Sequence, residues 1–287
     1  MGARHDTRKA LAAAGLRPRR SLGQHFLCDP AVVGRIVEAA RLGPASTVLE
    51  IGPGLGALTD ALAARAARVH LVELDHRLAA HLRERFAVRP SVTVHEGDVL
   101  VLPLDELVHE PEAVVVANLP YNVSTPILFR LLEHRARFPR AVLMLQREVA
   151  VRLASKPGTG DWGVLPVMVQ TWGVVRLAFG VSRRSFLPPP RVESAVVTIE
   201  WSREPRVPIG DPAAHRAVVR AAFGQRRKML RNALAALAGE RGVGLDAAFA
   251  LAAIDPQARA ETLGLDDFAR LARAMAGGRG AAAPQRT

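Results

Sequence analysis

The segment from Thr47 to Gly56 (TVLEIGPGLG) most constrains how this chain can fold. Its apolar first half predicts a strand, and the pattern of residues 57–67 predicts that a helix follows. Glycines at every second position from Gly52 let the backbone turn tightly and leave room for a ligand to lie against it. This G-x-G-x-G spacing differs from the G-x-G-x-x-G of dinucleotide enzymes. The segment therefore predicts a strand, a ligand-binding turn and a helix.

A carboxylate at the end of the next predicted strand supports a nucleoside site. The strand covers residues 69–74, and Glu73 follows the first glycine by roughly 20 residues, the usual separation for a carboxylate that binds ribose hydroxyls. The alternative is a structural turn with a solvated Glu73. The glycines and the acid together favour a nucleoside-binding β-α-β unit.

The composition limits the class of protein. A chain of 287 residues with 49% hydrophobic residues can bury one large core or two. It contains no uncharged apolar run of about 18 residues and no signal-peptide pattern. Its single cysteine, Cys28, excludes an internal disulfide and fits a reducing compartment. We therefore expect a soluble, cytoplasmic protein without a membrane span.

The net charge of +12 is concentrated at the two ends of the chain. Residues 1–20 carry six Lys or Arg against one acid, and residues 203–287 carry 14 against eight, whereas the residues between are nearly neutral. Basic surfaces attract phosphate backbones through counterion release. This segregation favours a nucleic-acid partner. The alternative is an ordinary solvated surface on which arginine replaces lysine.

Strands and helices alternate up to about residue 203, and only helices are expected beyond it. Further strands are expected at 92–94, 113–117, 141–146, 174–179 and 192–201, and further helices at 30–40, 76–86, 126–134 and 147–154. Residues 163–170 are read as either a helix or a strand. The C-terminal helices are expected at 212–222, 226–238, 245–253 and 265–275. We predict an α/β domain with a mainly parallel sheet and a small all-α domain.

The segment Asn118-Leu-Pro-Tyr-Asn-Val-Ser-Thr125, after the predicted strand 113–117, carries the most specific chemical signal. The exocyclic amine of adenine is a poor nucleophile because its lone pair is delocalised into the ring. The Asn118 side-chain oxygen and a backbone carbonyl held in place by Pro120 can accept hydrogen bonds from that amine and favour a pyramidal nitrogen. Tyr121 can stack on a base that has left its helix. The alternative is a Pro-bounded turn.

Three further features are candidate contacts. Asp98 follows the strand expected at 92–94, which suits a base-edge contact, and a solvated loop acid is the alternative. Phe186, in an extended Pro-rich loop at 185–191, is expected either to contact a substrate base or to pack locally. Cations at the expected start of the helix 226–238 oppose its dipole, so they are interpreted as contacts for a partner. These cations are Arg226, Arg227, Lys228 and Arg231.

Taken in order, these segments resemble those of KsgA-type rRNA adenine dimethyltransferases over residues 18–271. The matching segments are SLGQHFL from Ser21, EIGPGLG from Glu50, VELD from Val72, GD at Gly97, NLPYNVST from Asn118, FLPPPRVESAV from Phe186 and FGQRRKMLRN from Phe223. The resemblance implies a Rossmann-like class I methyltransferase domain over 21–203. It also implies a helical RNA-binding domain over 204–276. Charge and composition add a basic arm (1–20) before the methyltransferase domain and a Gly/Ala-rich tail (277–287) that is expected to be disordered.

By this resemblance the chain uses S-adenosylmethionine, leaving S-adenosylhomocysteine. It implies dimethylation of the exocyclic amines of two adjacent adenosines in the 3′-terminal hairpin of 16S rRNA, within an immature 30S subunit. The implied cofactor contacts are His25, Leu27, Gly52, Gly54, Glu73, Asp98 and Asn118. A monomer without a metal is expected. The family often has Asn where this chain has His25 and Tyr where it has Trp162; we expect altered contacts and retained activity.

The resemblance assigns catalysis to Asn118, Leu119, Pro120 and Tyr121. We expect in-line methyl transfer without a covalent intermediate and without a required general base, so that orientation and desolvation carry the rate. One alternative is the related family that methylates an adenine of large-subunit rRNA and confers macrolide resistance. Another is a non-catalytic RNA-binding assembly factor. A nicotinamide oxidoreductase is disfavoured by the glycine spacing.

Overall fold

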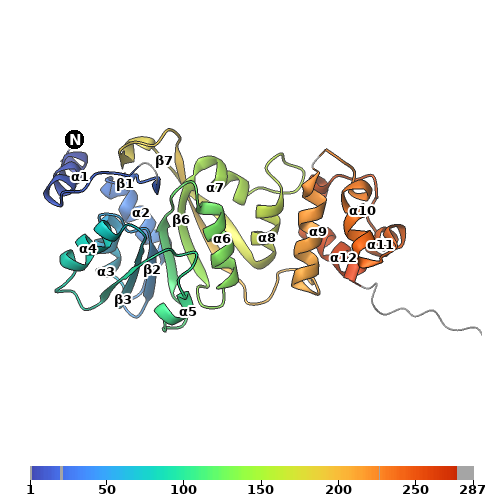
Figure 1. The fold of residues 1–287 in the computed structure, drawn as a ribbon, viewed down its shortest axis with the longest axis horizontal. Helices are drawn as coiled ribbons and strands as arrows, with labels where there is room; N and C mark the ends of the chain where they lie inside the picture. Colours follow the sequence, from blue (N-terminus) through green and yellow to red (C-terminus); the bar gives the residue numbers. More distant parts are fainter. Residues whose placement is uncertain (1, 20–21, 226, 277–287) are drawn as a thin grey trace, which may run out of the picture. The chain divides into compact units, whose positions relative to one another are not determined.

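The computed structural model describes residues 2–19, 22–225 and 227–276, and contacts divide the chain into two units (Figure 1). The first unit comprises Met1–Val151 and Val174–Arg203, and the second comprises Arg152–Gly173 and Glu204–Thr287. Residues 152–173 therefore group with the helical unit, although the sequence prediction assigns them to the α/β domain. The functional domain boundaries stay a prediction, and the expected disordered tail, 277–287, lies outside the described residues.

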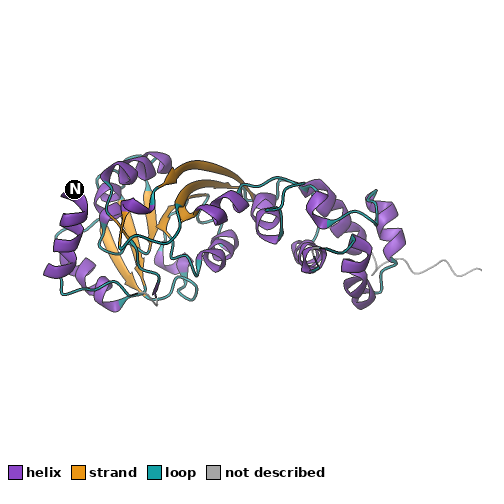
Figure 2. Cartoon of the chain, turned by 90° about the horizontal axis from the view of Figure 1, so that it is seen from above, coloured by secondary structure: helices purple, strands orange, loops and turns teal. Residues whose placement is uncertain are grey.

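A seven-stranded sheet forms the centre of the first unit, in the order β4-β3-β2-β5-β6-β9-β7. The strands are β2 (Thr47–Ile51), β3 (Arg68–Glu73), β4 (Val92–Glu96), β5 (Val114–Asn118), β6 (Arg140–Gln146), β7 (Gly173–Val181) and β9 (Ser194–Trp201). The five strands from β4 to β6 in this order pair in parallel, and β9 runs antiparallel to β6. Figure 2 shows helices on both sides of the strands. The predicted α/β class with a mainly parallel sheet is confirmed.

Two helices of the first unit, α2 (Pro30–Ala40) and α4 (His76–Arg85), begin at side-chain caps that the sequence supplies. At α2, the Asp29 carboxylate accepts the N–H groups of Ala31 and Val32, and proline occupies the first helical position. The Asp75 carboxylate caps α4 by accepting the N–H of Arg77. The other helices are α3 (Ala57–Ala63), α5 (Leu104–Leu107), α6 (Ser124–Glu133) and α7 (Arg147–Leu153). Apolar faces of these helices, such as that of α2, bury against the sheet.

The basic arm is a folded part of the first unit. Residues Gly2–Ala13 form α1, and the chain then returns to β1 (Phe26–Leu27), which pairs antiparallel with β8 (Phe186–Leu187). A single 3-10 turn, Arg183–Ser185, precedes β8. The sequence predicts a loop at residues 185–191, and the structure has the short strand β8 within them. A strand of two residues is specified by its distant partner β1 and leaves no local sequence pattern.

The second unit is helical in the part that the structure describes. Its helices are α8 (Val164–Trp172), α9 (Pro212–Gly224), α10 (Leu230–Arg241), α11 (Leu245–Ala252) and α12 (Leu265–Ala276), with a 3-10 turn at Ala260–Thr262. Residues 163–170, left open between helix and strand, are thus mostly helical. The buried Trp162 indole donates its Nε1–H to the carbonyl of Leu263 over 2.8 Å, which ties the segment before α8 to the segment before α12.

The predicted helix start at residue 226 is wrong. The helix α10 begins at Leu230, and the backbone N–H of Leu230 donates to the carbonyl of Ala258. That partner is distant in sequence, so no local signal placed the boundary. Arg227 and Lys228 therefore belong to the connection between α9 and α10, Arg231 lies in the first turn of α10, and Arg226 lies outside the described residues.

The expectation that Phe186 contacts a substrate base is corrected by its burial. The ring is 0% exposed and packs within the main core of the first unit, beside residues such as Leu27, Val181 and Val196. The pairing of β8 with β1 turns this side chain inward. The local-packing alternative is the one that the structure supports.

We predict that Phe186→Ala lowers the free energy of unfolding by about 3–5 kcal/mol, because a fully buried phenyl ring leaves a cavity. Denaturant unfolding measures the loss. Val192→Ala, at a side chain that is 40% exposed, serves as the control and is expected to stay within about 0.5 kcal/mol of the wild type. Unchanged stability combined with weakened RNA binding would instead restore a substrate-contact role for Phe186.

Candidate active site

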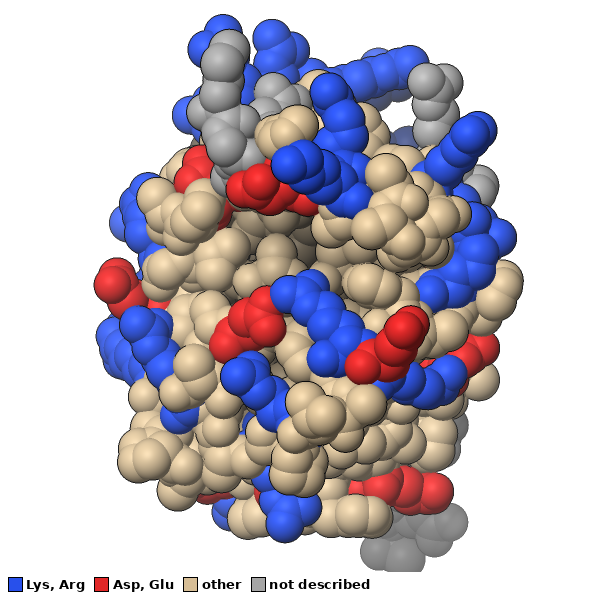
Figure 3. Space-filling view, turned by 90° about the vertical axis from the view of Figure 1, so that its left-hand side faces the viewer, with Lys and Arg blue, Asp and Glu red and all other residues tan. Residues whose placement is uncertain are grey.

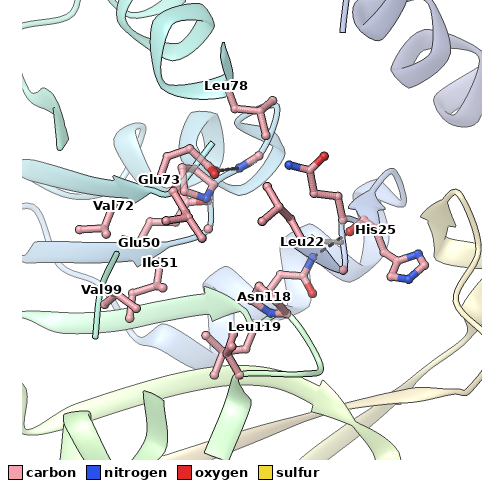
Figure 4. Close-up of a pocket in the computed structure, with 18 of the residues that line it drawn as sticks. Leu22, His25, Glu50, Ile51, Val72, Glu73, Leu78, Val99, Asn118 and Leu119 are labelled. Carbon is pink, nitrogen blue, oxygen red and sulfur yellow. Dashed lines mark hydrogen bonds between the residues drawn. The ribbon is translucent and has the colours of Figure 1, made fainter. Parts of the chain in front are cut away.

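A pocket opens at the carboxyl ends of β2, β3 and β5 (Figure 4). In the register of the sheet, Ile51 is paired with both Val72 and Ala117. The residues that follow these three are Gly52 after Ile51, Glu73 after Val72 and Asn118 after Ala117. They therefore lie in one row across the sheet. All ten predicted cofactor and catalytic residues line this pocket: His25, Leu27, Gly52, Gly54, Glu73, Asp98, Asn118, Leu119, Pro120 and Tyr121. The structure thus brings together residues from five separate segments.

The turn after β2 brings the main chain of two glycines, Gly52 and Gly54, to the pocket. Gly52, Gly54 and Gly56 have φ angles of 67°, 59° and 82°, in the left-handed region that favours glycine. A Cβ on Gly54 would lie 3.0 Å from the Phe26 ring, so even an alanine would crowd this cradle. The turn is suited to hold the flat, polar body of a nucleoside close to the main chain.

Glu73 closes the cradle from the neighbouring strand. One carboxylate oxygen accepts the N–H of Gly54 over 3.1 Å, and the other accepts the N–H of Asp75 over 2.9 Å. The side chain is buried, and burial raises the pKa of Glu73 despite these two bonds. Each oxygen keeps a further lone pair, so the fixed carboxylate can accept hydrogen bonds from a ribose diol. The residues present therefore fit a nucleoside cofactor.

Asp98 lies past β4 on the same side of the pocket. Its Oδ1 accepts the N–H of Leu100 over 2.9 Å, and this bond fixes the turn and leaves Oδ2 for a ligand donor. The strand β4 extends to Glu96, so His95 and Glu96 belong to the strand and do not follow it as predicted. Asp98 is nevertheless placed where it can accept from an adenine amine.

Asn118, the last residue of β5, is held by the N-terminal segment. Its side-chain nitrogen donates to the backbone carbonyl of His25 over 3.1 Å. A carbonyl can only accept, so this contact fixes which end of the amide is the nitrogen. The amide oxygen is thereby left as an acceptor within the pocket. This is the group that the sequence analysis required for binding the target amine.

Two rings line the same pocket as Asn118. The rings of His25 and Tyr121 stack with centroids 5.8 Å apart at an angle of 27°. The Tyr121 hydroxyl is 2.7 Å from Ser194 Oγ, and His25 Nδ1 is 2.8 Å from the carbonyl of Pro188. Since that carbonyl accepts, Nδ1 carries the proton. The Pro-rich segment thus positions a histidine at the pocket, a relation that local sequence patterns did not indicate.

Glu50 is a site residue to which the sequence analysis gave no role. It lines the pocket, is 1% exposed and accepts a hydrogen bond from Thr59 Oγ1 over 2.7 Å. Burial raises the pKa of Glu50 to about 8, the Thr59 hydrogen bond opposes the rise, and the neighbouring Glu73 charge adds to it. The available signal was a lone acid inside an otherwise apolar strand, 47–51.

The predicted RNA-binding cations are in the second unit. Arg227 and Lys228 are exposed, and Arg231 pairs with Asp246 at 2.5 Å. No group of three or more His, Cys, Asp and Glu side chains in 2–19, 22–225 and 227–276 is arranged to hold a metal ion. Across the same ranges, none of the helices has the length and apolarity needed to cross a membrane.

A protein-family model covers most of this chain. A model described as ribosomal RNA adenine dimethylase matches residues 15–276. Among curated proteins, the chain is 46% identical over 257 residues to the ribosomal RNA small subunit methyltransferase A of Syntrophotalea carbinolica, covering 90% of this chain and 96% of that protein. It is 47% identical over 265 residues to the protein of the same name from Geobacter metallireducens, covering 91% and 96%.

Two solved structures share the fold at appreciable identity. A dimethyladenosine transferase from Plasmodium falciparum superposes with a TM-score of 0.73 and 27% identity, covering 86% of this chain and 96% of that one. The 23S rRNA methyltransferase ErmE superposes with a TM-score of 0.65 and 30% identity, covering 88% and 99%.

We predict that Glu50→Gln changes how stability depends on pH. The pKa of Glu50 is about 8 in the folded protein and 4.5 in the unfolded chain. Between these pH values the folded protein keeps a proton on Glu50 that the unfolded chain releases. The free energy of unfolding of the wild type therefore falls as the pH rises from 4.5 to 8. Glutamine does not titrate, so the variant does not lose this stability. Its free energy of unfolding relative to the wild type should rise by up to about 4 kcal/mol from pH 4.5 to 8.

Urea unfolding at a series of pH values measures this difference. Glu148→Gln, at an exposed glutamate on α7, is the matched control and should leave the pH profile unchanged. Parallel profiles for wild type and Glu50→Gln would show that Glu50 is ionised in the folded protein.

Proposed function

Because the chain belongs to the ribosomal RNA adenine dimethylase family, we propose that it modifies small-subunit rRNA. The chain is an rRNA adenine dimethyltransferase that uses S-adenosylmethionine. The proposed targets are the exocyclic amines of two adjacent adenosines in the 3′-terminal hairpin of 16S rRNA, within an immature 30S subunit. Curated relatives named for the small subunit are 43–47% identical over nearly their whole length. We further propose that it acts in the cytoplasm as a monomer without a metal.

The anchored amide of Asn118 is the observation that carries this proposal. Its nitrogen is occupied by the carbonyl of His25, so the oxygen can accept a hydrogen bond from an adenine amine. A carbonyl of the Leu119-Pro120 segment supplies a second acceptor. Two acceptors favour a pyramidal amine whose lone pair points away from the ring. Tyr121, whose hydroxyl contacts Ser194, offers its ring face to the extruded base.

The cofactor side of the pocket consists of backbone and carboxylates. S-adenosylmethionine, when bound, supplies a methyl group on a positively charged sulfur. The Gly52–Gly54 turn would hold its main body, Glu73 its ribose hydroxyls and Asp98 its adenine amine. His25 and Leu27 would border the methionine end. The row formed by Gly52, Glu73 and Asn118 thus aligns cofactor and target along one edge of the sheet.

Proximity and orientation would supply most of the rate. The described pocket lining contains no cysteine, and Cys28 is buried with its thiol 3.2 Å from the Ser185 carbonyl, to which it donates. A covalent enzyme intermediate therefore has no support. The amine becomes acidic once it is methylated, so the proton can leave to solvent without a dedicated base.

The fold does not separate this function from methylation of large-subunit rRNA, because ErmE shares it. We favour the small-subunit target because the sequence identity is 43–47% to the relatives named for the small subunit and 30% to ErmE. Binding without catalysis, as in an assembly factor, is disfavoured because the glycine turn, Glu73, Asp98 and Asn118 all converge on one pocket. We propose that Arg227, Lys228 and Arg231, together with Arg226, contact rRNA phosphates.

We predict that Asn118→Ala lowers kcat for methyl transfer by about 100-fold or more, because the acceptor for the developing charge on the amine is lost. Asn122→Ala is the matched control: this residue lies four positions along the same segment, is exposed and does not line the pocket. It should retain near-normal turnover. Steady-state assays with circular dichroism as a folding check measure both variants, and near-normal turnover of Asn118→Ala would refute its role.

We also predict the site of methylation. Labelled methyl from S-adenosylmethionine should appear in the 3′-terminal fragment of 16S rRNA when small subunits lacking these dimethyladenosines are the substrate. Naked large-subunit rRNA, assayed in parallel, should stay unlabelled. Label in the large-subunit RNA alone would support the macrolide-resistance reaction, and binding to subunits without any label would support the assembly-factor reading.

A further inference from the structure

A second cavity of the first unit lies between the N-terminal arm and the segment after β8. It is lined by two arginines and a set of apolar side chains, chiefly Arg8, Leu11, Leu16, Arg17, Leu187 and Pro188. None of these residues lines the pocket that contains Asn118. The cavity is therefore distinct from that pocket.

The arm that forms one side of this cavity is fixed by packing. Leu11 and Leu16 are buried, in a cluster with Phe26, Leu55 and Leu78. After α1 the backbone reverses at Gly15, whose φ is 63°, and the N–H of Leu16 donates to the carbonyl of Leu11 over 2.8 Å. Side chains on both sides of the reversal thus face the same space. The cavity is a feature of the folded arm.

The opposite side of the cavity is a thin wall shared with the active-site pocket. Leu187 pairs with Phe26, and the carbonyl of Pro188 accepts from His25 Nδ1 over 2.8 Å. Leu187 and Pro188 line the cavity, whereas Phe26 and His25 line the pocket. A base that enters the pocket beside His25 and Tyr121 therefore lies across this wall from the cavity.

The charge at this cavity is unneutralised in the part of the chain that the structure describes. Arg8, Lys9 and Arg17 are exposed and form no ion pair with any described acid, whereas Arg19 pairs with Asp75. Lys and Arg side chains gather at the top of the face in Figure 3, at the level where Figure 1 places α1. Guanidinium groups bind phosphate, and apolar walls accept the face of a base or ribose. Together they match a nucleotide better than a simple anion.

We propose that this cavity binds the nucleotide adjacent to the target adenosine, with its phosphate on Arg8 and Arg17 and its base or sugar against Leu11, Leu187 and Pro188. The inference rests on the proposed function, since it requires an adenosine of an RNA strand in the main pocket. The arm then sets which adenosine of a strand enters the pocket by holding its neighbour.

The test compares two charge-matched double variants in methyl transfer to small subunits lacking the dimethyladenosines. R8A/R17A removes the cavity arginines, and R65A/R89A removes two exposed arginines that line neither the cavity nor the pocket. We expect R8A/R17A to raise KM for subunits by about tenfold, with kcat and cofactor affinity unchanged, and the control to stay within about twofold. The slope of log KM against log salt should fall by about 1.4 if two single-strand phosphates are released.

A second measurement locates the nucleotide. Subunits carrying 4-thiouridine directly beside the adenosine pair should photo-cross-link to peptides containing residues 8–17 or 187–188. Equal effects of the two double variants, or cross-links that avoid both peptides, would overturn the inference while leaving methylation intact. Absence of methyl transfer by the wild type would instead remove the proposed function and this inference with it.

Discussion

The parallel pairing of β2 with both β3 and β5 is the constraint on which the rest of this structure depends. Parallel neighbours need crossover connections, so every strand of this set ends at the same edge of the sheet. The shared register at Ile51 then places Gly52, Glu73 and Asn118 in one row, although they are far apart in sequence. A slip of one residue between β2 and β5 would direct the Asn118 side chain to the other face and separate the groups that bind cofactor and target.

The strand β2 also contains one residue, Glu50, that does not favour folding stability. All five residues of β2 are buried, yet one of them is Glu50. A buried acid is unfavourable unless it is neutral or well partnered, and here burial and the nearby Glu73 both disfavour its ionised form. An apolar residue at this position would pack without that penalty. The exception falls at the edge of the pocket, where such violations of local folding rules are expected.

Much of the first unit could be predicted because its signals are local. The glycine turn after β2 and the strand ends at Glu73 and Asn118 are each specified by a few adjacent residues, and the structure ends both strands within one residue of the predicted positions. The errors share a different cause. The burial of Phe186 depends on pairing with Phe26 and Leu27, and the start of α10 depends on the carbonyl of Ala258. Likewise, contact of His25 with Pro188 joins distant segments. Such partners cannot be read from periodicity or spacing.

The anchor of Asn118 is a main-chain carbonyl, and this has a consequence for how position 25 can vary. Every amino acid presents the same carbonyl, so a change of side chain there leaves the hydrogen bond to the amide nitrogen in place as long as the backbone path through β1 persists. The contact between the His25 imidazole and the Pro188 carbonyl is independent of this backbone hydrogen bond, so the side chain can be replaced without breaking that bond. A substitution at position 25 therefore does not change the orientation of the Asn118 side-chain oxygen. An asparagine or a histidine at position 25 can provide the same anchoring carbonyl.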